Sequence, residues 1–215
     1  MTAYASRNAR PIRVLITFGH LPYRLYIFIY MTFKERANNL QQKNLLFEYF
    51  VYLLEKWKGE INGHTIPSFT KLRLQKLLFL ACTINATIAE KRLMSVFNRF
   101  NALPYGPVEL DIYEAMNSNS FTHLTFKGND CTFEKQFENC NFDNLDNKLK
   151  EWTNEAISEL KCRRKDYLYM PVFDLVEITH QWTAWQTAIT VAEFLGSKSE
   201  EMTVENICNS NVKAY

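Results

Sequence analysis

Residues 70–80, TKLRLQKLLFL, decide how the fold of this chain is predicted. Leucines recur three and four positions apart, which is the spacing of one face of an α-helix. The residues assigned to that face are Leu74, Leu77, Leu78 and Ala81. Thr70 is a favourable N-cap residue, so the helix is predicted to run from residue 71 to about residue 87. Gln75 and Lys76 are predicted on another face, where a lysine is ordinarily a solvated charge.

Apolar residues at helical spacing predict further helices on both sides of this stretch. The predicted ranges are 34–58, 108–116, 144–160, 171–179, 184–195 and 203–208. Two short strands, 122–126 and 131–133, are predicted around a turn, and residues 95–103 are predicted to be a connector. Glycine and proline are scarce, at six each, which disfavours a turn-rich all-β sandwich. The sequence therefore predicts a mainly α fold, a single compact helical domain with one small β-hairpin.

The charge of the chain is unevenly distributed. Four of the 25 basic residues and none of the 23 acidic ones lie in residues 1–30, so residues 31–215 hold 21 basic against 23 acidic residues and carry −2. A dedicated nucleic-acid binder usually has a net basic domain or a dense basic face. DNA is therefore not an expected partner. A DNA-binding alternative rests on the arginines of residues 1–30 and on the short run 163–165.

Residues 1–30 differ in character from the rest of the chain. Their apolar patches are interrupted by glycine, histidine, proline and arginine, which argues against both a membrane span and a signal peptide. Met31 begins a sequence that continues into the helix predicted at 34–58. We therefore treat residues 1–30 as an N-terminal extension that need not belong to the native domain, and residues 31–215 as the domain. The expected location is the cytoplasm, with no membrane partner.

No pattern in the sequence indicates catalysis or metal binding. The five cysteines are odd in number and none is at C-x-x-C spacing, which favours reduced thiols in a cytosol. The four histidines are isolated from one another and from the cysteines at ligand spacing. There is also no glycine-rich phosphate loop, no G-x-S-x-G and no H-E-x-x-H. The chain is therefore predicted not to be an enzyme, and no catalytic residue, metal or cofactor is assigned to it.

Three segments in order resemble the Panacea domain of SocA-like antitoxins. Residues 70–80 are similar to its opening K-L-Q-K-L-L-Y-type helix, although Arg73 is an additional residue and Phe79 stands where tyrosine is common. Residues 97–108, FNRFNALPYGPV, end in the Y-G-P-V signature of that family. Residues 175–185, LVEITHQWTAW, are similar to its late T-H…W segment. Together they cover residues 70 to 190 of the chain.

The resemblance implies that the chain is an antitoxin of a toxin–antitoxin system. Members of the family neutralise co-encoded toxins of several kinds by direct binding, and in the SocA branch the antitoxin also delivers the toxin to a Clp-type protease. The expected partners are therefore a cognate toxin and, in the adaptor version, that protease. Two alternatives stay open: a DNA-binding regulator, and a phage or mobile-element protein that inhibits a host defence factor by binding it. The oligomeric state is left open.

The first two segments supply five candidate residues. If Gln75 points inward it needs hydrogen-bond partners and ties the Tyr-Gly-Pro turn in place. Gly106 is expected to permit a turn that other residues cannot adopt, and Pro107 to begin the next helix. Tyr105 has two interpretations: buried, it needs a partner for its hydroxyl group, and exposed, it is an interface anchor. Lys76 is the fifth candidate.

The late segment supplies three more candidates. His180 is expected to be a helix cap or a packed polar group rather than a base. Trp182 and Trp185 are expected in the core, although tryptophan is also enriched at binding hot spots.

Overall fold

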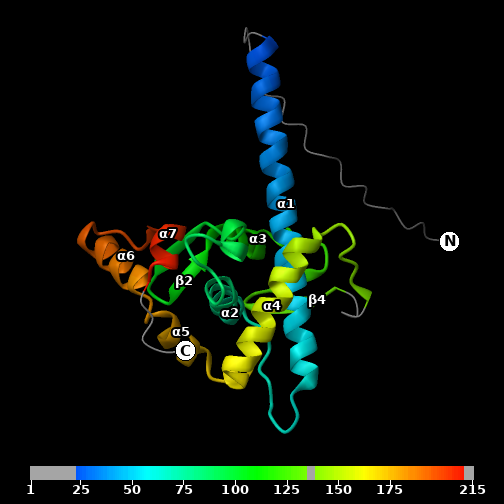
Figure 1. Cartoon of the computed structure of the whole chain (residues 1–215), viewed down its shortest axis with the longest axis vertical. Coiled ribbons are helices and arrows are strands. Elements are labelled where there is room, and N and C mark those ends of the chain that lie inside the picture. The colour runs from blue at the N-terminus through cyan, green and yellow to red at the C-terminus, as the bar shows by residue number, and fades with distance from the viewer. Residues whose placement is uncertain (1–22, 135–138, 211–215) are drawn as a thin grey trace, which may run out of the picture. The chain divides into compact units, whose positions relative to one another are not determined.

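The computed structural model describes residues 23–134 and 139–210 (Figure 1). The chain divides into two units, residues 1–38 and residues 39–215. The described part of the first unit is helical throughout. Within the described residues, no helix combines the length and the apolar character needed to cross a membrane.

The described part of the chain is mainly α-helical with small β-sheets, as the sequence predicts. Its helices are α1 (Tyr23–Glu60), α2 (Lys71–Thr83), α3 (Leu110–Ser118), α4 (Asn147–Arg163), α5 (Val172–Thr179), α6 (Thr183–Phe194) and α7 (Val204–Cys208). Two short 3-10 helices cover Arg92–Ser95 and Lys165–Leu168. Most predicted helices are confirmed to within a few residues, but α1 begins well before residue 34 and passes through Met31 without a break. Residues 1–22 lie outside the described residues, so the separate status of residues 1–30 stays a prediction.

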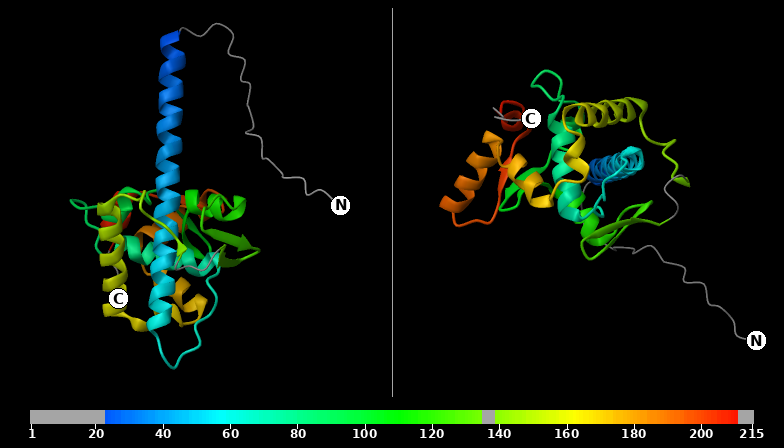
Figure 2. Two further views of the ribbon diagram at one scale, coloured as in Figure 1. Left: turned by 90° about the vertical axis from the view of Figure 1, so that its right-hand side faces the viewer. Right: turned by 90° about the horizontal axis from the view of Figure 1, so that it is seen from below.

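Helix α2 is the centre of the second unit. Thr70 caps it as predicted, since its side-chain oxygen accepts a hydrogen bond from the backbone N–H of Arg73 at 3.2 Å. Every residue from Arg73 to Cys82 is buried, so the prediction that only one face is buried is wrong. The views in Figures 1 and 2 place α4 and α5 beside α2, and both pack against it. A helix that is packed on all sides has no face left for solvated residues.

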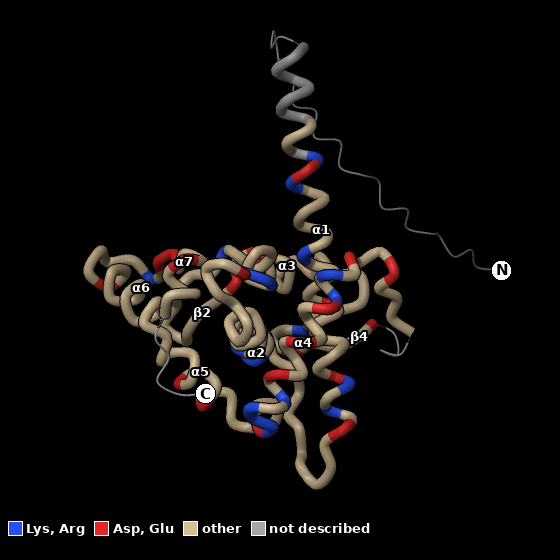
Figure 3. Tube along the Cα trace, in the orientation of Figure 1, with Lys and Arg blue, Asp and Glu red and all other residues tan. Residues whose placement is uncertain are grey.

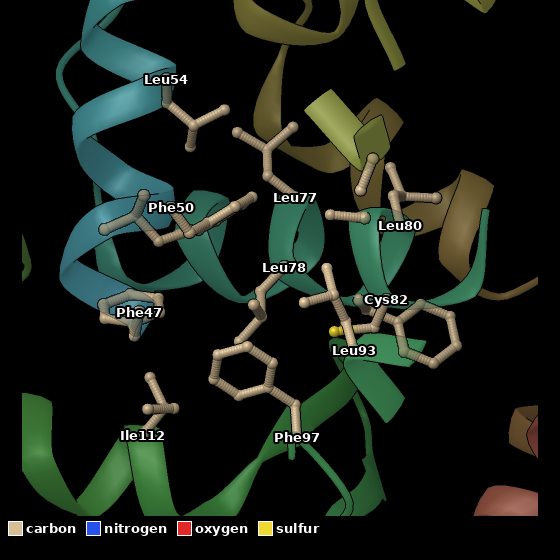
Figure 4. Close-up of a cluster of buried hydrophobic side chains, with 14 of the residues drawn as sticks. Phe47, Phe50, Leu54, Leu77, Leu78, Leu80, Cys82, Leu93, Phe97 and Ile112 are labelled. Atoms are coloured by element: carbon tan, nitrogen blue, oxygen red, sulfur yellow. The ribbon is translucent and has the colours of Figure 1, made fainter. Parts of the chain in front are cut away.

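The hydrophobic core forms where α2 meets the second half of α1 and the segment that follows α2. Figure 4 shows side chains from these elements directed toward one another. Those labelled there are Phe47, Phe50, Leu54, Leu77, Leu78, Leu80, Cys82, Leu93, Phe97 and Ile112, and all of them are buried. Full burial of such a side chain contributes about 1.5–3 kcal/mol, so this cluster is the main source of stability for the fold.

A three-stranded antiparallel sheet lies beside α2. It is formed by β1 (Phe100–Leu103), β2 (Gly106–Glu109) and β5 (Glu200–Met202) in the order β2-β1-β5. The sequence predicts a connector at 95–103 and a helix that begins at residue 108, so none of these three strands is predicted and both predictions are wrong there. Pro107 lies in β2 and does not begin a helix. Proline is tolerated there because β2 is an edge strand, which does not need every N–H for pairing.

The predicted hairpin is confirmed as β3 (Leu124–Lys127) and β4 (Asp130–Phe133), which pair with each other. The structure therefore has two hairpins where the sequence predicts one, because β1 and β2 also pair directly across Pro104 and Tyr105. This second hairpin carries the Tyr-Gly-Pro motif.

Candidate functional site

The side chain of Gln75 fastens the end of β2 to α2. Its Nε2 donates to the backbone oxygen of Glu109 at 3.3 Å, and its Oε1 accepts from the backbone nitrogen of the same residue at 2.9 Å. Gln75 is buried, and both halves of its amide are satisfied by one peptide segment. The inward-pointing alternative for Gln75 is therefore the one that occurs, and the residue holds the strand that follows the Tyr-Gly-Pro motif.

Lys76 is fully buried, so its interpretation as a solvated surface charge is wrong. Its Nζ donates to the backbone oxygen of Pro107 at 2.7 Å. Burial disfavours the charged form and lowers the pKa of Lys76 to about 7. The lysine therefore acts as an internal hydrogen-bond donor to the Tyr-Gly-Pro hairpin.

The low pKa of Lys76 predicts a pH-dependent stability. The unfolded chain keeps this proton up to pH values near 10, while the folded chain loses it above about 7. The unfolded state then binds more protons, so stability must rise with pH over this window, by at most about 1.4 kcal/mol per pH unit. We expect the free energy of unfolding of the wild type, measured against that of Lys76→Met, to increase between pH 7 and pH 9. Urea titrations of both proteins measure this, and a difference that stays flat would contradict a buried, proton-losing lysine.

Gly106 is the point at which the three motif segments meet. Its φ is +89°, a backbone conformation that favours glycine, as the turn chemistry predicts. A Cβ atom at this position would lie 2.7 Å from Oγ1 of Thr179 and 3.0 Å from Nζ of Lys76. The missing side chain lets α2, the β1–β2 hairpin and the end of α5 approach one another closely. This contact brings together the three segments that resemble the Panacea domain, although they are distant in sequence.

Tyr105 is exposed, so its buried interpretation is wrong, and its role as an interface anchor stays a prediction. It occupies the hairpin connection, 62% of its surface is accessible, and its ring centroid lies 6.4 Å from that of Phe173 on α5. Phe173 is itself 60% exposed. Two large aromatic side chains thus lie together at the surface, beside the buried motif residues. The sequence analysis missed Phe173, because a single aromatic residue in the first turn of a short helix has no signal of its own.

His180 caps the C-terminus of α5 and packs against Trp185. Its backbone N–H donates to the oxygen of Val176 at 3.0 Å, and its ring lies parallel to that of Trp185 with centroids 3.7 Å apart. Burial lowers the pKa of His180, Glu177 raises it and Lys76 lowers it further. The expectation of a cap or packed polar group is confirmed.

The two tryptophans differ in their surroundings. Trp182 is 1% exposed and meets the ring of Phe79 edge-on at 5.2 Å, so it belongs to the core as predicted. Trp185 is only partly buried, and its Nε1 donates to the backbone oxygen of Leu103 at 3.1 Å. Trp185 therefore links α6 to the strand that leads into Tyr105, and part of its ring stays accessible.

A buried ionic cluster also holds the Glu109 end of β2. Nζ of Lys43 contacts the carboxylates of Glu109 and Asp111, both at 2.5 Å, and Arg99 also pairs with Asp111. The Glu109 carboxylate is fully buried and accepts hydrogen bonds from the backbone N–H groups of Arg99 and Ile112 as well. Burial raises the pKa of Glu109, and the charge of Lys43 opposes that rise. No motif indicated this cluster, since its members are spread over 68 residues of sequence.

The described residues contain no group of three or more histidine, cysteine, aspartate or glutamate side chains arranged to hold a metal ion. The motif residues instead form a hairpin that buried side chains of α2 hold in place, with exposed aromatic side chains on its connection and on α5. Such an arrangement is suited to contact with another macromolecule.

Comparison with known proteins agrees with this arrangement. Residues 74–186 match the model of the family described as Antitoxin SocA-like, Panacea domain. No curated protein and no solved structure is significantly similar to the chain. The matched stretch is more than half of the chain and spans all eight residues singled out above, from Gln75 to Trp185. The chain therefore belongs to the SocA-like, Panacea-domain family of antitoxins.

Proposed function

We propose that this protein neutralises a co-encoded toxin by binding it directly, without catalysis of its own. Membership of the antitoxin family supports the role. The observation that carries direct binding is the exposure of Tyr105 and Phe173 on a hairpin and helix that buried residues of the family motifs hold in place. Aromatic side chains are enriched at protein–protein interfaces, and tyrosine is enriched among the residues that contribute most to binding.

The motif residues divide into two groups that fit this role. Gln75, Lys76, Gly106 and Trp182 are buried and hold α2, the hairpin and α5 together. Tyr105 lies on the accessible side of the same structure. A binding surface whose backbone is already fixed loses less conformational entropy when it meets a partner.

Co-expression with the product of the adjacent gene tests the proposal. That product, expressed alone, is expected to arrest growth, and co-expression of this chain is expected to restore it. The two proteins are also expected to purify together. A neighbour that is harmless at every expression level, or an arrest that persists at excess antitoxin, would contradict the proposal.

The adaptor version of the function adds a Clp-type protease as a second partner. In this version the toxin is degraded once it is bound, so its half-life falls when the antitoxin is induced. Pulse-chase labelling of the toxin in cells with and without the protease distinguishes delivery from simple occlusion. If neutralisation is complete and the toxin persists in both strains, delivery to the protease is not required.

A further inference from the structure

We propose that one surface, formed by Tyr105, Phe173, Glu177, His180 and Trp185 and named here the aromatic rim, receives an arginine or lysine side chain of the toxin. The inference rests on the proposed function and adds to it the place of contact and the chemistry of the partner. The occupant is thus a protein with a basic group that projects from an apolar surface.

The members of the aromatic rim lie near one another on the hairpin connection, α5 and the first turn of α6. Tyr105 lies beside Phe173, Glu177 Oε1 lies 3.9 Å from Nδ1 of His180, and the ring of His180 is stacked on that of Trp185. Phe173, Glu177 and His180 are four and three positions apart on α5 and at its C-cap, which places them along one side of the helix. The indole N–H of Trp185 donates to the backbone oxygen of Leu103, two residues before Tyr105. Trp185 is thereby attached to the strand that leads into Tyr105.

All members of the aromatic rim except Tyr105 lie in an acidic part of the chain. Residues 172–210 contain six acidic residues and one basic residue, a net charge of −5 in a protein whose total is +2. Figure 3 shows acidic positions on α5 and around α7. The acidic residues are Asp174, Glu177, Glu193, Glu200, Glu201 and Glu205, and none of them is buried. A field of one sign attracts a partner of the opposite sign and speeds the encounter.

Glu177 gives this general attraction a specific point of contact. Its side chain is 77% exposed, and its carboxylate lies 3.9 Å from the ring of His180, whose charged form burial disfavours. An exposed carboxylate between aromatic faces offers both ion pairing and cation–π contact. A guanidinium group satisfies both because it is planar, charged and weakly hydrated. The combination therefore selects a cationic side chain rather than a purely apolar one.

Single substitutions on the aromatic rim test the inference, with matched controls on α3. The rim variants are Tyr105→Ala, Phe173→Ala and Glu177→Lys, and the controls are Tyr113→Ala and Glu114→Lys, which replace exposed residues of the same types. Binding to the purified product of the adjacent gene is measured by titration calorimetry at two salt concentrations, and each variant is first melted. Because the side chains of Tyr105, Phe173 and Glu177 are exposed, these variants are expected to melt like the wild type.

We expect Tyr105→Ala and Glu177→Lys each to raise Kd by about 30-fold or more, the effect of losing a hot-spot residue. Wild-type binding is expected to weaken as salt is added, and Glu177→Lys to lose most of that dependence. The α3 controls are expected to bind like the wild type. Glu177→Gln is expected to fall between the wild type and Glu177→Lys, because it removes the charge without reversing it.

The outcomes separate this inference from the proposed function. If the wild type binds and neutralises the neighbour while the rim variants bind equally well, the aromatic rim is not the contact surface and the proposed function stands. If Glu114→Lys weakens binding as much as Glu177→Lys, the overall negative charge of the protein accounts for the effect. A specific site for a cationic side chain at Glu177 is then excluded. If the wild type does not bind the neighbour at all, the proposed function fails, and the inference fails with it.

Discussion

Replacement of Gly106 by alanine is expected to lower the free energy of unfolding by about 3 kcal/mol, with a range of roughly 2–5 kcal/mol. Two effects combine. The φ of +89° disfavours any residue with a Cβ by about 1–2 kcal/mol. The added methyl group would also lie 2.7 Å from Oγ1 of Thr179, a buried hydroxyl that is held by its hydrogen bond to Val176. Overpacking of this kind costs a further 1–3 kcal/mol or so.

Gly63 provides a matched control for the backbone contribution. Its φ is +81°, and nothing lies within 4 Å of the position that a Cβ would occupy. Gly63→Ala is therefore expected to lose only the 1–2 kcal/mol or so of backbone strain. Denaturant titrations of the two variants measure the difference. Equal losses would show that the close approach of Thr179 and Lys76 to Gly106 has no energetic consequence.

Gly106→Ala also tests whether the hairpin acts as a support for the partner surface. If it does, stability and toxin binding should fall together, because the variant displaces α5 from the hairpin. A Gly106→Ala protein that melts like the parent and no longer binds would show instead that the toxin contacts Gly106 itself.

The second large effect is expected for Lys43→Met, at about 3–5 kcal/mol of lost stability. Lys43 is buried and faces two carboxylates, and the carboxylate of Glu109 is fully inaccessible. Removal of the lysine leaves Glu109 to lose its charge or remain unpaired in the interior. Either state is costly, because burial already raises the pKa of Glu109 even with Lys43 present.

A double variant isolates this interaction. Glu109→Gln removes the buried charge, so Lys43→Met combined with Glu109→Gln is expected to lose less stability than the sum of the two single variants. The exposed pair of Lys161 with Glu60 is the comparison, and Lys161→Met is expected to cost no more than about 1 kcal/mol. Strictly additive losses in the double variant would mean that Lys43 and Glu109 are not coupled.

The helices of this protein could be predicted because each has enough turns to show a repeating apolar pattern. The burial of Lys76 could not, since helical periodicity reports the faces of a helix and not how many neighbours cover them. The sequence does not distinguish a buried lysine on α2 from a surface lysine. The difference is the hydrogen bond to the backbone oxygen of Pro107, which depends on the tertiary structure. The burial of Lys43 could not be predicted for the same reason, because its partners lie more than 60 residues away in the sequence.

The strands and the aromatic rim were missed for related reasons. β1, β2 and β5 have three or four residues each, too few for alternation to identify them, and they lack the Gly128-Asn129 turn that marks the equally short β3 and β4. The family motifs identified Tyr105, His180 and Trp185, but nothing in the sequence brings Phe173 to Tyr105. That contact depends on the direction in which α5 leaves Pro171, which is a property of the packing.

The late position of β5 has a consequence for the newly made chain. β1 is central in its sheet, yet the partner for its second edge, Glu200–Met202, lies about one hundred residues further along. During translation β1 can pair with β2 soon after both emerge, but its other edge stays open until almost the whole polypeptide has been synthesised. Open edges invite pairing with other chains, and the glutamates of β5 discourage that once the strand is in place. A chain that ends before residue 200 therefore leaves one edge of β1 unpaired, and such a chain is expected to associate with other chains more readily than the full-length protein.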